Sequence, residues 1–189
     1  MDLVDWRRVD SRAAVARQIV IDPEASTQTY LLTFCCYGTH LPGDERGWIE
    51  RQRAGQRGGF REPERALHRF AREQMLESPY TLDDESAQTV LNAIQEVCVA
   101  RAWQLLATHV RTNHVHCVVG GLAQPNRAIG DFKAYASRAL NQMEGYRKRW
   151  SRHGSTRRLM DSAAIESAVR YVADGQGAPM AIYVWHRNE

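Results

Sequence analysis

Residues 103–119, with the sequence WQLLATHVRTNHVHCVV, contain the pattern that decides the fold. Apolar and β-branched residues predict strands over Trp103–Val110 and His114–Val119, and the short polar segment between them predicts a β-hairpin. Along the second strand His114 and His116 project from one face, because successive side chains of a strand alternate. Two imidazoles at this spacing can chelate one divalent ion. The alternative is a pair of histidines on an exposed sheet face without a ligand.

The segments on either side of this hairpin predict an α+β fold. The order is strand, helix, strand, strand, helix, followed by a further helix and strand, which matches a ferredoxin-like split βαβ core with an antiparallel sheet. Polar residues ahead of the apolar patterns indicate where helices begin. The predicted flanking elements are a strand over Thr27–Tyr37, helices from Asp83 or Asp84 to Arg101, over Ala128–Gly145 and from Asp161 to Asp174, and a short strand over Met180–Trp185.

The length of 189 residues predicts one domain with additions. We expect residues 1–27 to form an N-terminal arm and residues 28–186 to form a single domain with a long inserted loop at about 43–80. Glycine and proline punctuate Gly38–Gly59, which predicts a loop, whereas Pro63–Leu76 has a helical pattern. No apolar stretch approaches the ~20 residues of a membrane span, and no signal-peptide pattern is present, so we expect a cytoplasmic protein without a membrane partner.

Positive charge is concentrated in one part of the sequence. Nine Lys/Arg and two acidic residues lie between Arg127 and Arg158, in a chain whose total net charge is +3. We interpret the end of this segment as a basic loop that contacts a polyanion; the alternative is a solvated basic helix face. Trp150 either stacks on an unpaired base or anchors the loop to the core. The candidate phosphate-binding residues are Lys133, Arg138, Arg147, Lys148, Arg149, Arg152, Arg157 and Arg158.

Cleavage of a phosphodiester at the histidine pair also needs a nucleophile. Two histidine ligands leave open positions on a metal ion, and a substrate phosphate oxygen can occupy one of them. Tyr135 and Tyr171 both lie in predicted helices after the histidine strand, and composition does not choose between them. A phenolate near a divalent ion is stabilised, which makes attack on phosphorus plausible. His109 is expected to face the other side of the sheet and to have a structural role.

Three sequence motifs occur together along the chain: YGTHLPGDERGW at 37–48, NHVH at 113–116 and AVRYVADGQG at 168–177. Together they resemble the single-tyrosine HUH transposases, in particular the REP-associated tyrosine transposase branch, over about residues 29–183. The resemblance implies a ferredoxin-like fold of the HUH endonuclease type. It also implies a histidine pair that holds Mg²⁺ or Mn²⁺, and single-stranded, hairpin-forming DNA as the partner.

The resemblance further implies a tyrosine nucleophile on the helix after the basic segment, a position that matches Tyr171 and not Tyr135. This tyrosine attacks a DNA phosphate, forms a 5′-phosphotyrosine and releases a 3′-hydroxyl, and a 3′-hydroxyl later rejoins the strand without a nucleotide cofactor. The sequence departs from the family pattern one helical turn after the tyrosine, where a third metal ligand, Gln or Asn, is expected and Gly175 stands. Gln176 is our candidate for that ligand, and Asp174 is the alternative.

Two other functions are consistent with the same residues. One is a DNA-hairpin binding protein that is catalytically inactive or repurposed, since Gly175 replaces the expected ligand. The other is a metallo-phosphodiesterase that uses water in place of Tyr171. The sequence leaves open whether the protein is a monomer or a homodimer, and whether the site is built within one chain.

Overall fold

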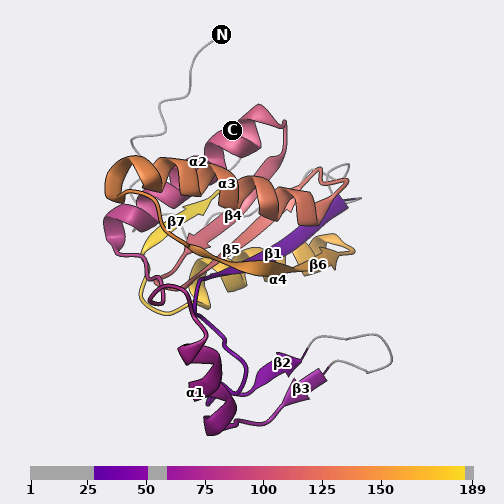
Figure 1. The fold of residues 1–189 in the computed structure, drawn as a ribbon. Helices are drawn as coiled ribbons and strands as arrows, with labels where there is room; N and C mark the ends of the chain where they lie inside the picture. Colours follow the sequence, from indigo (N-terminus) through magenta and orange to yellow (C-terminus); the bar gives the residue numbers. More distant parts are fainter. Residues whose placement is uncertain (1–27, 51–58, 186–189) are drawn as a thin grey trace.

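A five-stranded antiparallel sheet forms the centre of the molecule (Figure 1). The computed structural model describes residues 28–50 and 59–185. The strands are β1 (Thr29–Cys36), β4 (Gln104–Val110), β5 (His114–Gly120), β6 (Trp150–Leu159) and β7 (Ala181–Val184). Their order is β6-β1-β5-β4-β7. The first four reproduce the strand order of a split βαβ core, which confirms the predicted α+β fold, and β7 extends the sheet beyond β4.

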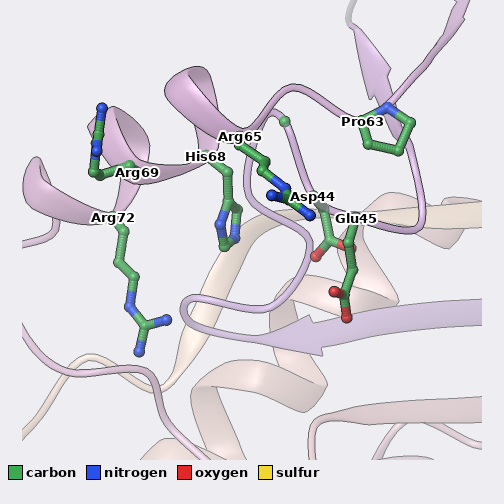
Figure 2. A pocket seen from close by; sticks show the side chains of 8 residues that line it. Asp44, Glu45, Pro63, Arg65, His68, Arg69 and Arg72 are labelled. Carbon is green, nitrogen blue, oxygen red and sulfur yellow. The ribbon is translucent and has the colours of Figure 1, made fainter.

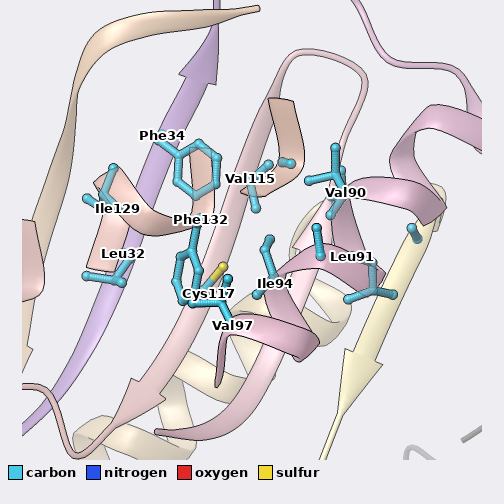
Figure 3. Close-up of a cluster of buried hydrophobic side chains, with 14 of the residues drawn as sticks. Leu32, Phe34, Val90, Leu91, Ile94, Val97, Val115, Cys117, Ile129 and Phe132 are labelled. Carbon is cyan, nitrogen blue, oxygen red and sulfur yellow. The ribbon is translucent and has the colours of Figure 1, made fainter. Parts of the chain in front are cut away.

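Helices cover the two faces of the sheet unequally. α2 (Asp84–Ala100) and α3 (Pro125–Glu144) pack on one face, and α4 (Ser162–Asp174) packs on the other. The α2/α3 face buries a large apolar cluster that includes Leu32 and Phe34 of β1 (Figure 3). Burying such a side chain stabilises the fold by ~1.5–3 kcal/mol. The cluster on the α4 face is smaller and draws on β4, β5, β6 and α4, so this face is less completely used as core.

Two helices begin where their capping residues predict. The Asp83 carboxylate accepts a hydrogen bond from the backbone N–H of Ser86 at 2.9 Å, and the Ser86 hydroxyl accepts one from the Asp83 N–H, which completes a capping box. Asp161 caps α4 by accepting from a backbone N–H in its first turn. α3 begins at Pro125, ahead of the predicted start at Ala128, because proline is tolerated in a first helical turn. Across the described parts of the chain, no helix is long and apolar enough to cross a membrane.

The basic segment that ends at Arg158 is largely a strand, which corrects the predicted loop. β6 pairs with β1, with Leu31 opposite Arg157 and Tyr30 opposite Arg158. It is an edge strand of the sheet, so its charged side chains can reach water. The segment lacks the alternation of apolar and polar residues from which a half-buried strand is recognised. Its pairing with β1 is what makes it a strand.

The insertion between β1 and α2 contains secondary structure of its own. It consists of a hairpin, β2 (Trp48–Glu50) and β3 (Gly59–Arg61), and a helix, α1 (Arg65–Glu73). The loop predicted over Gly38–Gly59 is therefore wrong at β2 and at the start of β3, whereas the helical pattern at Pro63–Leu76, within the predicted insertion at about 43–80, is confirmed by α1. Figure 1 shows the three elements set apart from the sheet and its covering helices. The predicted arm at residues 1–27 lies outside the described residues.

Candidate active site

His114 and His116 lie side by side on the α4 face of β5. Their ring centroids are 4.8 Å apart. The alternating residues Val115 and Cys117 are buried in the α2/α3 cluster on the opposite face, so the predicted projection of both imidazoles from one face is confirmed. His114 is half-buried and His116 is buried, and neither ring therefore stands free in solvent.

One nitrogen of each imidazole is held by a protein partner. Nδ1 of His114 lies 2.7 Å from Oδ1 of Asn113. Because this oxygen is an acceptor, Nδ1 carries the proton. Nδ1 of His116 lies 2.8 Å from the hydroxyl of Thr33, its cross-strand partner on β1. In each ring Nε2 is the nitrogen left for a ligand, as in metal sites where a second partner orients the ligating histidine.

The surroundings favour neutral imidazoles. Burial, with smaller contributions from His114 and His109, lowers the pKa of His116 to about 4. Burial is also the main cause of the lowered pKa of His114, and the nearby Arg111 and Arg46 add to it. A neutral imidazole is the form that binds a metal ion.

Tyr171 of α4 reaches the histidine pair. Its ring centroid lies 5.5 Å from that of His116, with the ring planes at 72°, and the residue is 46% exposed. Tyr135, the other candidate, lies on α3 and packs against the α2/α3 cluster, with the guanidinium of Arg138 4.1 Å from its ring. The two tyrosines that composition did not separate thus lie on opposite sides of the sheet, and of the two Tyr171 is the one beside the histidines.

Gln176 lies beside the same three side chains. Its amide nitrogen donates to the backbone carbonyl of Tyr171 at 3.4 Å. Hydrogen bonding to Gln176 raises the pKa of both His114 and His116 against the larger effect of burial, so the Gln176 amide lies beside the pair. Asp174, the alternative ligand, is exposed at the end of α4. Within residues 28–50 and 59–185, no third His, Cys, Asp or Glu joins the histidines.

Gly175 adjoins the tyrosine at the end of α4. Its N–H donates to the carbonyl oxygen of Tyr171 at 3.0 Å. A Cβ at this position would lie 2.8 Å from that oxygen and 3.1 Å from Cδ2 of the Tyr171 ring. A side chain here would therefore press on the tyrosine.

His109 of β4 has both ring nitrogens engaged by the backbone. Nδ1 donates to the carbonyl of Val172 at 3.0 Å, and Nε2 accepts from the N–H of Met180 at 3.4 Å. The expected structural role is confirmed, since the residue joins β4 to α4 and to the start of β7. The expected orientation is wrong: His109 is the cross-strand partner of His116 and shares its face.

The predicted phosphate-binding residues differ in how exposed their charged groups are to solvent. Arg149 is 2% exposed, and its guanidinium donates to Oδ1 of Asn141 and, over 2.6 Å, to the carbonyl of Gly145. This burial excludes Arg149 as a surface contact. Arg147 is half-buried, with its guanidinium 4.8 Å from the centre of the Tyr80 ring. The exposed members of the set are Arg138, Lys148, Arg152, Arg157 and Arg158.

Lys133 and Trp150 hold β6 against α3. The ammonium of Lys133 donates to the carbonyls of Ser151 and His153 at 2.7 and 2.8 Å. The indole N–H of Trp150 donates to the carbonyl of Lys133 at 3.1 Å, and the ring packs edge-on against Phe34. Of the two roles left open for Trp150, the structure supports the anchor.

The sequence did not assign two groups near the site to the site itself: Thr33, and the loop residues Asp44 and Arg46, which it indicated only as loop-shaping. Thr33 is one of two threonines in the mostly apolar strand β1, and its position in the sequence does not indicate that it lies opposite His116. Asp44 and Arg46 form a two-point ion pair, with Nε and Nη2 of Arg46 each 2.8 Å from a carboxylate oxygen. This pair holds the pKa of Asp44 well below its usual range. Arg46 lies close enough to His114 to lower the pKa of that imidazole.

The sequence profile described as IS200-like transposase matches residues 77–173, more than half of the chain. The chain belongs to this family. The matched part of the transposase contains both the histidine strand and the tyrosine helix, so the resemblance stated from the motifs is confirmed. No curated protein matches the sequence. A solved structure of a REP-associated tyrosine transposase bound to a REP hairpin is similar over 82% of this chain and 68% of its own, with 14% identity and a TM-score of 0.43.

Proposed function

We propose that this transposase nicks and rejoins single-stranded DNA, with Tyr171 as the nucleophile and a divalent metal ion at His114 and His116. The observation that carries the proposal is that these three side chains come together on one face of the sheet, within a single chain. The ring centroids of His114 and His116 are 4.8 Å apart, and those of His116 and Tyr171 are 5.5 Å apart. A half-exposed phenol beside two oriented, neutral imidazoles suits nucleophilic attack on a metal-bound phosphate.

The residues present fit a divalent ion. Nε2 of His114 and of His116 are the ring nitrogens left by the contacts with Asn113 and Thr33, and Oε1 of Gln176 is the candidate third ligand. Two nitrogens and one oxygen leave positions for water and phosphate oxygens, which is compatible with Mg²⁺ or Mn²⁺. When bound, the ion would polarise the scissile phosphate and stabilise the charge that develops on it.

The proposed chemistry consists of two transesterifications. In the first, the phenol oxygen of Tyr171 loses its proton to solvent and bonds to phosphorus, while the bond from phosphorus to the 3′-oxygen breaks. The products are a 5′-phosphotyrosine and a strand that ends in a 3′-hydroxyl once its oxygen is protonated. In the second, a 3′-hydroxyl attacks the same phosphorus and releases the tyrosine. The number of phosphodiester bonds is conserved, so no nucleotide cofactor is required.

The exposed basic residues of β6 are the proposed contact for the DNA backbone. Arg157 lies opposite Leu31, a residue packed against the α4 cluster, and cross-strand partners share a face, so Arg157 is on the side of the catalytic residues. Arg152, Arg158 and Lys148 add exposed charge along the same edge. Such contacts position DNA without reading its sequence. Hairpin-forming single strands are the first substrates to test, because of the resemblance to REP-associated transposases.

A covalent trapping assay tests the proposal. Purified protein is incubated with end-labelled single-stranded DNA that contains hairpins, with Mn²⁺ or with EDTA, and resolved on a denaturing gel. We expect a slow-migrating protein–DNA adduct in the wild type with metal, and its loss in Tyr171→Phe and His114→Ala. Tyr135→Phe is the matched control, since it removes the hydroxyl of the tyrosine on the other face and should leave the adduct unchanged.

The other outcomes separate the alternatives. An adduct that survives in Tyr171→Phe would identify another nucleophile. Cleavage without any adduct, in both the wild type and Tyr171→Phe, would indicate attack by water. Binding without cleavage over several hairpin families would favour a repurposed DNA-binding protein, a candidate that Gly175 at the expected ligand position supports.

A further inference from the structure

One face of α1 is lined with basic side chains that the proposed chemistry does not use. Arg65, His68, Arg69 and Arg72 recur at intervals of three and four residues, which places them on one side of the helix. We call this set the α1 basic face. Figure 2 shows these side chains around a pocket between α1 and the loop that follows β1. The pocket has a volume of about 710 Å³.

The charges of this face are not neutralised inside the protein. The three arginines are exposed, and among the described residues none of them has an ion pair or hydrogen bond from its guanidinium. Asp44 also lines the pocket, but both of its carboxylate oxygens are engaged by Arg46. Glu45 contributes one negative charge against three guanidinium groups. The pocket therefore has a net positive charge and is suited to an anion.

The spacing of the face fits a chain of phosphates better than a single one. From Arg65 to Arg72 the helix advances by about 10 Å, at ~1.5 Å per residue. One phosphate cannot contact guanidinium groups distributed over that length, whereas consecutive phosphates of an extended strand can. Guanidinium forks also match phosphate oxygens in two-point contacts.

The same loop joins this face to the catalytic residues. On one side the loop supplies Gly43, whose carbonyl accepts from the N–H of Glu64 at 3.1 Å just before α1. On the other side it supplies Thr39, whose hydroxyl donates to the carbonyl of Asn113, the residue before His114, at 3.3 Å. A strand that leaves the histidine pair along this loop would next meet α1, on an element unrelated to the basic edge of β6.

We propose that the α1 basic face is a second phosphate-binding surface, which holds the backbone of the single strand that flanks the cleaved phosphate. The inference rests on the proposed function, since it requires DNA at the catalytic residues. It gives the insertion between β1 and α2 a role: it lengthens the DNA footprint beyond the hairpin. Arg69 and Arg72, the two arginines in the second half of α1, are the contacts to test.

Two DNA lengths and one double variant test the inference. The short probe is a hairpin with a minimal flank at the cleavage site, and the long probes extend that flank by single-stranded nucleotides on one side or the other. Fluorescence anisotropy gives the dissociation constant as a function of salt. For Arg69→Gln/Arg72→Gln we expect binding of one long probe to weaken about tenfold and its salt dependence to fall by about 1.4 in log–log slope, at ~0.7 per phosphate of a single strand. Binding of the short probe, and its covalent adduct, should not change.

Arg127→Gln is the control for loss of charge. Arg127 is exposed near the start of α3, at the end of the sheet remote from His114, and has no ion pair in the described part of the chain. Gly43→Ala tests position without changing charge: its Cβ would lie 2.3 Å from the carbonyl oxygen of Glu64 and 2.5 Å from the N of His68, at a φ of +82°. Since this shifts α1 away from the loop, the long probe should again bind more weakly than the short one.

Three results would overturn the inference. If Arg69→Gln/Arg72→Gln binds every probe as the wild type does, while Arg152→Gln/Arg157→Gln weakens binding, the α1 surface is rejected and the proposed function stands. An equal loss for the short and long probes would mean a general charge effect, which Arg127→Gln should then reproduce. If the folded wild type binds no DNA hairpin at all, the proposed function fails and this inference fails with it.

Discussion

The two faces of the central sheet are made from the same strands but differ in what they can hold. The α2/α3 face is covered by two long helices and is apolar throughout its buried cluster. The α4 face is covered by one shorter helix, and beyond its small cluster it carries His109, His114, His116 and the half-exposed Tyr171. In β5 the two faces alternate residue by residue, so one strand contributes to core and site at once.

The comparison shows that one face of the sheet mainly supplies the apolar core, while the other also carries the candidate site residues. Polar groups are costly on a fully covered face unless each is hydrogen-bonded. On the α4 face the buried groups meet that condition, since His109 is bonded to the backbone and His116 to Thr33. Because α4 covers this face only in part, Nε2 of His114, Nε2 of His116 and the phenol of Tyr171 remain available to a ligand. Substitutions on the two faces should therefore differ in whether they affect stability or activity.

The largest expected effect is on the α4 face. Tyr171→Phe should lower single-turnover DNA cleavage by at least about 10³-fold, because it removes the proposed nucleophile. The midpoint of thermal unfolding should stay unchanged, since the lost hydroxyl makes no hydrogen bond within the described residues. Quench-flow cleavage and a thermal melt on the same preparation measure both. A large fall in the melting midpoint would mean that Tyr171 belongs to the core instead.

A matched pair of leucines compares the two faces directly. Leu140 of α3 belongs to the α2/α3 cluster and Leu159 of β6 to the α4 cluster, and both are buried. Each Leu→Ala change should lower the free energy of unfolding by about 2–5 kcal/mol. At a temperature where both variants are folded, Leu159→Ala should also slow cleavage, because its cluster seats the helix that carries Tyr171. Equal cleavage rates, measured beside urea unfolding curves, would contradict the proposed division.

The buried histidines should make the α4 face sensitive to acid. The pKa of His116 is lowered from 6.5 to about 4, and burial lowers those of His109 and His114 as well. Between these values the unfolded chain binds protons that the folded chain does not, so stability falls as the pH drops from about 6.5 toward 4. Urea unfolding of metal-free protein at pH 7 and pH 4.5 measures the difference. His116→Asn should lose less stability over this interval, and an unchanged loss would place the effect elsewhere.

The smallest effect concerns charge at the edge of the α4 face. Arg157→Gln should reduce the log–log salt dependence of hairpin binding by about 0.7–0.9, the contribution of one phosphate contact. Arg127→Gln removes a comparable exposed charge from α3, which covers the opposite face of the sheet, and should change the slope little. If the two variants behave alike in an anisotropy titration, the β6 edge is not a specific DNA surface.

Most elements could be predicted because their signals are local. The hairpin around the histidines, the caps at Asp83 and Asp161 and the face of α2 each depend on residues within one or two turns of chain. β6 escaped prediction because its ten residues, WSRHGSTRRL, are strand-forming only when β1 is beside them. The hairpin of β2 and β3 was missed for a related reason, since three-residue strands between glycines give no recognisable alternation.

Some features of the candidate site could likewise be predicted from the sequence, and others could not. That His114 and His116 share a face follows from the covalent geometry of an extended chain, so the sequence alone determined it. The residues alone did not choose between Tyr135 and Tyr171, and the family resemblance favoured Tyr171. The structure separates the two, because α3 and α4 pack on opposite faces. Burial of Arg149 could not be foreseen in a run of surface-like basic residues.

The sequence by itself determined the periodic and capped elements, their α+β order and the histidine pair, because each is set by the conformations available to neighbouring residues. Tertiary structure alone decided which groups meet across the chain: Thr33 with His116, and the backbone carbonyl of Val172 with His109. These contacts join residues far apart in sequence. Their geometry depends on how helices and strands pack, and packing is a property of the whole apolar surface that is buried rather than of any single segment.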